Sequence, residues 1–364
     1  MNNLEERILQ ALGTVQDPDL KQDLVTLGMI QELQVKGNGV NFVLALTTPA
    51  CPLKEVLKKA CFDAIHTQVN SSLSVEIRLT TQVTSSRDNT PVLPKVKNII
   101  AIASGKGGVG KSTIATNVAV ALAQHGAQVG LLDADIYGPS IPTMLNCEHA
   151  QPQVVEDDGK KYFVPLERHG IRLQSIGLLT PPDDATVWRG PMASKALRQL
   201  LIDTAWGTLD YLLIDLPPGT SDIHLTLVQA APITGAVIIT TPQKVALADA
   251  RKGLAMFRKQ QINVPVLGIV ENMAYFTPTE LPHSKYYIFG QGGGEALAIQ
   301  QHVPLLGQVP LVQRICKQSD IGQPSVLQAG LAATAFNQIA TTLAQQVAIR
   351  NAQLAPTKRV LRTK

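Results

Sequence analysis

Residues 99–113 read IIAIASGKGGVGKST, and this stretch decides the fold. The apolar run 99–103 predicts a buried strand, and a helical pattern begins near Lys111. The glycines between them predict a loop whose backbone N–H groups curl around a phosphate, because a side chain would block that approach or forbid positive φ values. The stretch therefore predicts a strand, a phosphate loop and a helix in succession.

The loop also matches the nucleotide-binding pattern G-x-x-x-x-G-K-[ST]. In this pattern the Lys111 ammonium reaches the β- and γ-phosphates, the Ser112 hydroxyl binds Mg²⁺, and the helix N-terminus adds its dipole. A glycine-rich turn with a surface lysine is the alternative, and the flanking strand and helix disfavour it. The residues expected to bind the nucleotide are Gly105, Lys106, Gly107, Gly108, Val109, Gly110, Lys111, Ser112 and Thr113.

The composition is that of a soluble globular protein with room for two domains. The chain has 364 residues, of which 45% are hydrophobic and 16% charged, and its formal net charge is +4. Part of the positive charge lies in a basic tail, 351–364, which we expect to be solvated. The charge is therefore no nucleic-acid signature, and we expect no nucleic-acid partner.

The sequence also indicates a compartment. The start, MNNLEERILQALG, is acidic and amphipathic and lacks the basic and apolar regions of a secretory signal. No run of about 18 apolar residues predicts a membrane span. The four cysteines show no C-x-x-C spacing, so they predict neither a disulfide framework nor a zinc site. We therefore expect a cytoplasmic protein without stable membrane association.

Residues 1–80 predict a small α+β domain. The signals are helical spacing over 4–12, strands at 30–35 and 40–46 around a Lys-Gly-Asn-Gly turn, a helix over 53–65 and a strand at 75–79. Residues 81–97 are polar, contain two prolines and predict a linker. The phosphate loop then belongs to a second domain over 98–350.

Two further apolar runs in the second domain end in carboxylates. The run 129–132 precedes Asp133 and Asp135, and the run 211–214 precedes Asp215. Carboxyl ends of parallel strands face the ligand crevice of an α/β sheet, so these side chains should point at the nucleotide. Asp215 closes its run as in a Walker B segment and is expected to hold the hydration shell of Mg²⁺.

Later segments extend the same alternation. Strand signals at 235–240 and 265–270 flank helical spacing over 246–258. Repeated βα alternation predicts an α/β fold, a P-loop NTPase whose mainly parallel sheet is covered by helices on both faces.

Several segments resemble one protein family in order and wording. The loop with its extra Lys106 resembles the deviant Walker A loop of the SIMIBI P-loop ATPases, which include MinD/ParA proteins, the nitrogenase iron protein and the Mrp/ApbC iron-sulfur cluster carriers. The resemblance to the Mrp/ApbC carriers covers nearly the whole chain, through LLDADIYGPSIP, LLIDLPPGTSD, VWRGPM, VENMAYF and YIFGQGG. The first domain resembles the iron-sulfur-assembly domain fused ahead of many Mrp ATPases.

The resemblance implies a function and roles for residues. It implies slow, Mg-dependent ATP hydrolysis by a homodimer that passes iron-sulfur clusters to apoproteins and works with assembly factors. Lys106 would reach the nucleotide of the other subunit, although by residue type alone it could be a solvated lysine that adds positive potential. Asp135 would orient or activate the attacking water, Asp215 would be the Walker B residue, and Asn272 would contact the adenine.

One segment departs from the family. Many members carry a Cys-x-x-Cys pair where this chain reads TPTELPHSKY at 277–286, and dimerisation brings two such pairs to one cluster. Thiolate is the preferred ligand of these clusters, and a lone His283 would substitute only in part. Cys51, in the loop TTPACP, is the remaining candidate ligand, against the alternative of a half-buried helix-cap cysteine. We expect a labile cluster that depends on Cys51.

Competing functions remain open at the level of sequence. A MinD/ParA-type positioning ATPase would need a basic amphipathic terminal helix, but the periodic segment 326–350 has a polar face of Gln, Thr and Ala. A redox subunit like the nitrogenase iron protein would need cluster cysteines beside the nucleotide, and Cys147 and Cys316 lie in other contexts. A cluster carrier is the function we expect, and a cluster-free ATPase is the alternative that the missing Cys-x-x-Cys leaves.

Overall fold

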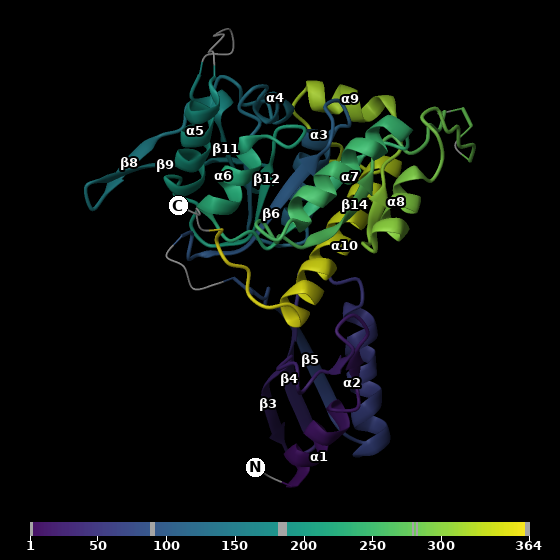
Figure 1. Ribbon diagram of the computed structural model, residues 1–364. Coiled ribbons are helices and arrows are strands. Elements are labelled where there is room, and N and C mark those ends of the chain that lie inside the picture. The colour runs from purple at the N-terminus through teal and green to yellow at the C-terminus, as the bar shows by residue number, and fades with distance from the viewer. Residues whose placement is uncertain (1–2, 88–91, 181–187, 279, 282, 361–364) are drawn as a thin grey trace. The chain divides into compact units, whose positions relative to one another are not determined.

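The computed structural model describes residues 3–87, 92–180, 188–278, 280–281 and 283–360. It divides the chain into two compact units, one of residues 1–84 with 348–354 and one of residues 85–347 with 355–364. Figure 1 shows the elements of both units along the chain. Each unit has a hydrophobic core of its own.

The first unit is an α+β module in which helices pack on a three-stranded sheet. Its sheet has the order β3-β4-β5, with an antiparallel β3–β4 hairpin and a parallel β4–β5 pair joined through α2. Ile8, Phe42 and Ile65 are fully buried in its core. The elements are α1 (Asn3–Leu12), β1 (Gln16–Asp17), β2 (Gln22–Asp23), β3 (Ile30–Lys36), β4 (Gly39–Leu46), α2 (Lys54–Gln68) and β5 (Ser74–Thr81).

The two edge strands of this sheet differ. In β3 the pairing register shifts between Gln31 and Gln34, and Glu32 between them has a φ of +51°. In β5 every residue from Ser74 to Thr81 pairs with β4 without interruption. A bulge disrupts the ladder and twists an edge strand. Among the described residues, β5 is therefore the regular open edge of the sheet.

The second unit is built on an eight-stranded sheet with the order β10-β11-β7-β12-β6-β13-β14-β15. Its first half contains β6 (Val96–Ser104), α3 (Lys111–Gln124), β7 (Val129–Asp133), α4 (Ile141–Met144), β8 (Val154–Asp157), β9 (Lys160–Phe163), β10 (Leu166–Arg168), β11 (Ile171–Ser175), η1 (Ile176–Leu178), α5 (Gly190–Ile202) and β12 (Leu209–Asp215). Its second half contains α6 (Asp222–Ala230), β13 (Gly235–Thr240), α7 (Lys244–Arg258), β14 (Val266–Glu271), α8 (Gly293–Gln301), β15 (Leu305–Gln308), α9 (Gln313–Asp320), η2 (Ser325–Leu327) and α10 (Leu331–Gln353).

Helices cover both faces of this sheet (Figure 1). Alternate strand residues such as Ile99, Leu212 and Ile238 join one buried cluster with residues of α5, α6, α7 and α8. On the other face α3 contacts β6, β7 and β12, and Ile339 of α10 lies close to Gly307 of β15. All strand pairs except β10–β11 are parallel. The predicted α/β fold with a mainly parallel, doubly covered sheet is confirmed.

Element boundaries differ from the prediction at the ends of the expected linker and tail. β5 ends at Thr81 and β6 begins at Val96, so both strands enter the expected linker 81–97, of which residues 88–91 lie outside the described residues. α10 extends to Gln353, three residues into the expected tail 351–364, and residues 361–364 are not described. Arg87 of the expected linker and Thr357 of the expected tail form an isolated β-bridge.

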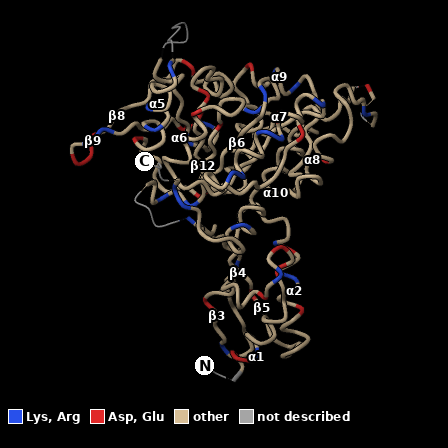
Figure 2. Tube along the Cα trace, viewed as in Figure 1, with Lys and Arg blue, Asp and Glu red and all other residues tan. Residues whose placement is uncertain are grey.

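Three features of the described residues bear on partners. Lys and Arg are interspersed with Asp and Glu over both units, as Figure 2 shows, which accords with the small net charge. The periodic C-terminal segment forms α10, whose Phe336, Leu343 and Val347 are buried as expected for a core-packing helix. No described helix has the length and apolar character needed to cross a membrane.

Candidate functional site

The phosphate loop lies between β6 and α3, where the sequence predicts it. Gly108 and Gly110 have φ values of +77° and +79°, which glycine adopts without the strain of a side chain. A Cβ atom at Gly105 would collide with the backbone carbonyl of Asp249 in α7. Glycine is thus required at Gly105 for close packing and at Gly108 and Gly110 for backbone conformation.

The loop ends at the N-terminus of α3. Gly110 is the N-cap, and no side chain among the described residues caps the first turn. The first backbone N–H groups of a helix have no acceptor within the helix, and together with the helix dipole they form an anion site. Lys106, Gly107 and Gly108 are exposed, so the loop also presents an accessible face.

Four side chains form a polar cluster at the start of α3. Lys111 Nζ lies 2.7 Å from Asp215 Oδ1 and 3.9 Å from Asp135 Oδ2. The Ser112 hydroxyl donates a hydrogen bond to Asp215 Oδ2 at 2.6 Å. Lys111 is 6% exposed and Asp215 is fully buried, so each charge requires the other as its partner. The ends of β7 and β12 and the start of α3 therefore meet at one point, beside the loop.

Asp133 adds a further buried carboxylate to this region. Its Oδ2 accepts hydrogen bonds from the Ser175 hydroxyl at 3.1 Å and from the Ile141 amide at 3.3 Å. Burial, together with the nearby charge of Asp215, raises the pKa of Asp133 to about 8. Burial also raises the pKa of Asp135 and of Asp215. A raised pKa favours the protonated form, so Asp133 contributes a buried carboxyl group to the site rather than a full negative charge at neutral pH.

The structure brings together most, but not all, of the expected nucleotide residues. Lys111, Ser112, Asp135 and Asp215 meet in the cluster described above. Lys106 lies apart on the exposed face of the loop, and its ammonium forms no ion pair with any described residue. Its exposure leaves it available to a partner, so its role across a dimer stays a prediction.

Asn272 lies against the phosphate loop. Its side-chain amide donates a hydrogen bond to the carbonyl of Val109 at 2.8 Å, and the residue is 6% exposed. The preceding residue, Glu271, is fully buried and accepts hydrogen bonds from the Gly294 amide and from Gln308 Nε2. The end of β14 thus connects the loop with the start of α8. An adenine contact by Asn272 stays a prediction.

Two further buried residues, Glu271 and His224, were not singled out from the sequence. His224 lies in the first turn of α6, with Nδ1 3.4 Å from the Ser221 hydroxyl and Nε2 without a partner among the described residues. Burial lowers its pKa to about 4, and the charge of Lys111 adds to the effect. Asp133, which we expected from the sequence to point at the nucleotide, instead bonds to Ser175 and to the Ile141 amide.

Within neither unit do the cysteines form a cluster site. Cys61 and Cys147 are buried, and burial raises their pKa values to about 12 and about 11. Burial also raises the pKa of the half-buried Cys51, which favours its thiol over its thiolate, and Cys316 is exposed on α9. In the described part of the chain, no group of three or more His, Cys, Asp or Glu side chains could hold a metal ion.

The segment in place of the family's cysteine pair still closes as a turn. Phe276 and Tyr286 exchange two backbone hydrogen bonds of 2.8 Å, and Lys285 Nζ lies 4.2 Å from the ring centre of Tyr275. Residues 279 and 282 lie outside the described residues, and His283 is exposed. The turn is therefore present, without a thiol to act as a ligand.

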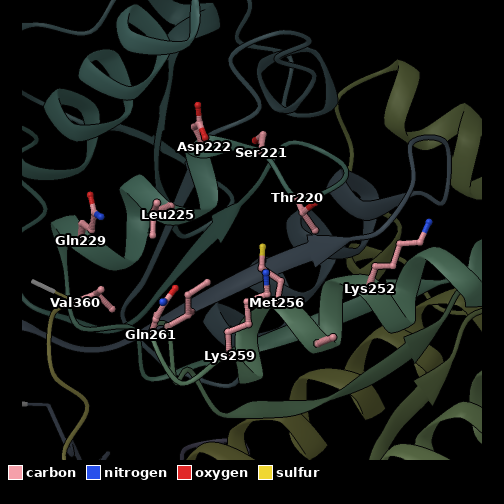
Figure 3. A pocket seen from close by; sticks show the side chains of 12 residues that line it. Thr220, Ser221, Asp222, Leu225, Gln229, Lys252, Met256, Lys259, Gln261 and Val360 are labelled. Carbon is pink, nitrogen blue, oxygen red and sulfur yellow. The ribbon is translucent and has the colours of Figure 1, made fainter. Parts of the chain in front are cut away.

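A separate cavity of about 760 Å³ borders the loop that follows Asp215 (Figure 3). Thr220, Ser221 and Asp222 line one side of it, and Lys252 and Met256 of α7 line another. Its described lining includes neither Lys111 nor Asp215. This cavity is therefore distinct from the cluster around Lys111.

Two family models match the chain. Residues 95–347 match the model described as NUBPL iron-transfer P-loop NTPase, and residues 5–78 match the one described as iron-sulfur cluster assembly protein. The first match contains the phosphate loop and both aspartates of the cluster. The second lies within the first unit.

Relatives and a solved structure agree with these matches. An iron-sulfur cluster carrier protein of Synechocystis sp. is 49% identical over 345 residues, which are 94% of this chain and 96% of that protein. One of Deinococcus radiodurans is 46% identical over 97% of this chain and 98% of that protein. A structure described as a nucleotide-binding protein of Archaeoglobus fulgidus in complex with ADP superposes with a TM-score of 0.56 at 39% identity. It covers 65% of this chain and 91% of that one.

Proposed function

Because the chain belongs to the NUBPL iron-transfer P-loop NTPase family, we propose that it hydrolyses ATP and carries iron-sulfur clusters to apoproteins. The observation that carries the ATPase half is the cluster of Lys111, Ser112 and Asp215 at the open end of α3. The ammonium of Lys111, the hydroxyl of Ser112 and the carboxylate of Asp215 lie beside the phosphate loop. Positive φ values at Gly108 and Gly110 give this loop a backbone conformation suited to anion binding.

The residues suggest a division of labour during hydrolysis. The ammonium of Lys111, now paired with Asp215, would move onto the β- and γ-phosphates and neutralise charge that develops in the transition state. Asp135 is 16% exposed and 3.9 Å from that ammonium, which suits a carboxylate that orients the attacking water. The N–H groups of the loop and of the first turn of α3 would hold the phosphate oxygens.

The donor set also fits a magnesium ion. Ser112 offers a hydroxyl and Asp215 an adjacent carboxylate, and Mg²⁺ takes oxygen ligands while it keeps several waters. Ser112 would bind the ion directly and Asp215 through water, and the bound ion would supply further charge neutralisation between the β- and γ-phosphates.

We propose that the working form is a homodimer. Lys106 has no ion-pair partner among the described residues and extends from the exposed face of the loop, while Lys111 already serves the phosphates. A second subunit would bring its own Lys106 to the nucleotide. The proposed setting is the cytoplasm, where apoprotein clients and assembly factors would deliver or accept clusters.

The cluster is cargo, and the proposed ligand for it is Cys51. Within each unit the described cysteines form no group that could hold a metal, and only Cys51 lies in a loop beside a proline in the iron-sulfur-assembly module. A cluster usually takes about four ligands, so ligands would be shared between subunits or with a client. The raised pKa of Cys51 predicts weak, labile binding.

Anaerobic reconstitution tests this proposal. Iron and acid-labile sulfide are counted per chain for the parent, for Cys51→Ala and for Cys316→Ser, and transfer to an apo-ferredoxin is followed by absorbance. We expect labile loading of the parent and of Cys316→Ser, and none of Cys51→Ala. If Cys51→Ala binds as much iron and sulfide as the parent, Cys51 is not the ligand. Absence of loading in the parent would favour a cluster-free ATPase.

A further inference from the structure

The open edge of β5 offers a row of backbone groups for pairing. The Ser74 amide donates to Asn38 and the Gln82 amide to Leu46, each at 2.8 Å. Because backbone groups alternate in direction along a strand, the even-numbered residues of β5 bond to β4. The amides and carbonyls of Val75, Ile77 and Leu79 then point to the other side. No other strand in the described part of the chain pairs with this side.

Apolar surface lies next to this edge. A cavity of about 500 Å³ between α2 and β5 is lined by Phe62, Val75 and Ile77, with Lys58 and Glu55 at its border. Phe62 and Leu79 are 39% and 37% exposed. An added strand would therefore gain hydrogen bonds along β5 and would cover apolar side chains.

We infer that this edge pairs with the β5 edge of a second copy of the chain, antiparallel about Ile77. Only outward-pointing residues can exchange hydrogen bonds across the new seam, so odd-numbered residues must face odd-numbered ones. Three central registers satisfy this condition, and they place residue 76, 77 or 78 on the two-fold axis. The contact is independent of the nucleotide site and of the proposed function.

Charge selects one of the three registers. An axis at residue 76 sets Glu76 against Glu76, and an axis at residue 78 sets Arg78 against Arg78, which are unfavourable like-charge pairs. An axis at Ile77 sets Glu76 against Arg78 twice. Glu76 and Arg78 are the charged residues of β5.

The same register matches the remaining side chains. Val75 faces Leu79 and Ile77 faces its own copy on the α2 side of the sheet, while Ser74 faces Thr80 on the other side. A two-fold axis perpendicular to the sheet keeps both α2 helices on one face of the joined sheet. The cavity between α2 and β5 of one copy then lies next to the same cavity of the other copy. Two antiparallel copies of β5 therefore match in two respects: opposed side chains are compatible, and the outward backbone N–H and C=O groups face one another.

Charge reversal tests the seam in the full chain, without nucleotide and with a chelator present. Sedimentation velocity over a concentration series should show a monomer–dimer equilibrium for the parent. Glu76→Arg and Arg78→Glu should each raise the dissociation constant by about tenfold or more, because each puts like charges opposite twice. The double variant E76R/R78E restores opposite pairs and should recover the parent value.

A control addresses the pair that Arg78 already makes. Arg78 lies 3.0 Å from Glu32 within the same sheet, so Arg78→Glu also loses that contact. Glu32→Gln removes the same ion pair without changing β5, and it should dimerise like the parent. A monomeric parent, or a double variant as weak as the single ones, would overturn the inference.

Cysteine cross-linking tests the register independently. In a Cys316→Ser background, Glu76→Cys protein is mixed with Arg78→Cys protein under mild oxidation. Opposed residues in the seam bring Cβ atoms within about 5.5 Å, close to disulfide range, so unlike chains should cross-link in the mixture. Equal cross-linking of either variant alone would contradict an axis at Ile77.

Discussion

The hydroxyl of Ser112 and the carboxylate of Asp215 lie 2.6 Å apart, although 103 residues separate them in the chain. This bond joins the first turn of α3 to the end of β12, and Lys111 binds the other oxygen of the same carboxylate. One aspartate therefore orients both side chains that the loop pattern assigns to phosphate and magnesium. These contacts tie Lys111, Ser112 and Asp215 together in the arrangement without nucleotide.

Replacement of Lys111 by Ala should abolish ATP hydrolysis. The variant loses the charge that neutralises the phosphates, and we expect turnover to fall at least about 100-fold. It also leaves Asp215 buried without its cation, which should destabilise the fold by about 3 kcal/mol. Phosphate release and urea unfolding measure the two effects. Lys97→Ala, which breaks another Lys–Asp ion pair, is the matched control and should retain activity.

Replacement of Asp135 by Asn should separate binding from turnover. The amide keeps the size of the side chain but loses the charge that orients water, so turnover should drop by about 100-fold while nucleotide affinity is retained. Stopped-flow binding of a fluorescent ATP analogue and phosphate release provide the comparison. Equal losses in affinity and in rate would instead make Asp135 a structural residue.

Replacement of Lys106 by Ala should alter the dependence of activity on protein concentration. In a dimer with facing sites, hydrolysis per subunit rises with concentration until dimers saturate, and the variant should show a weaker rise. Lys106 is exposed, and substitutions at such positions usually change stability by less than about 0.5 kcal/mol, so the variant should remain folded. A rate strictly proportional to concentration in the parent, with a monomer in sedimentation with ATP, would count against the dimer.

Acid should destabilise the second unit through His224. Its pKa is lowered to about 4 from 6.5, so between these values the unfolded chain binds a proton that the folded chain does not. The stability it contributes is complete above about pH 6.5 and is lost as the pH falls toward 4, up to about 3 kcal/mol. Urea unfolding followed by tryptophan fluorescence should show this loss in the parent and a flatter profile in His224→Leu. Identical profiles would assign the acid sensitivity to other groups.

Local patterns explain how much of the site the sequence predicts. The strand, loop and helix around Lys111 are contiguous, and Asp135 and Asp215 follow apolar runs, so each carries its own signal. The contacts of Asp133 with Ser175 and of Glu271 with Gly294 join distant segments, and no local period reports them. The β8–β9 hairpin and the antiparallel strand β10 were likewise not predicted, because they interrupt the βα alternation.

The irregular strand at the far side of the small sheet sets a limit on assembly. A sheet with two regular edges can add copies at both and grow into a filament. Here the register shift around Glu32 interrupts β3, whereas pairing about Ile77 consumes the β5 edge of both copies. Strand addition would then stop after two chains, because the edge left free on each copy is the interrupted strand β3.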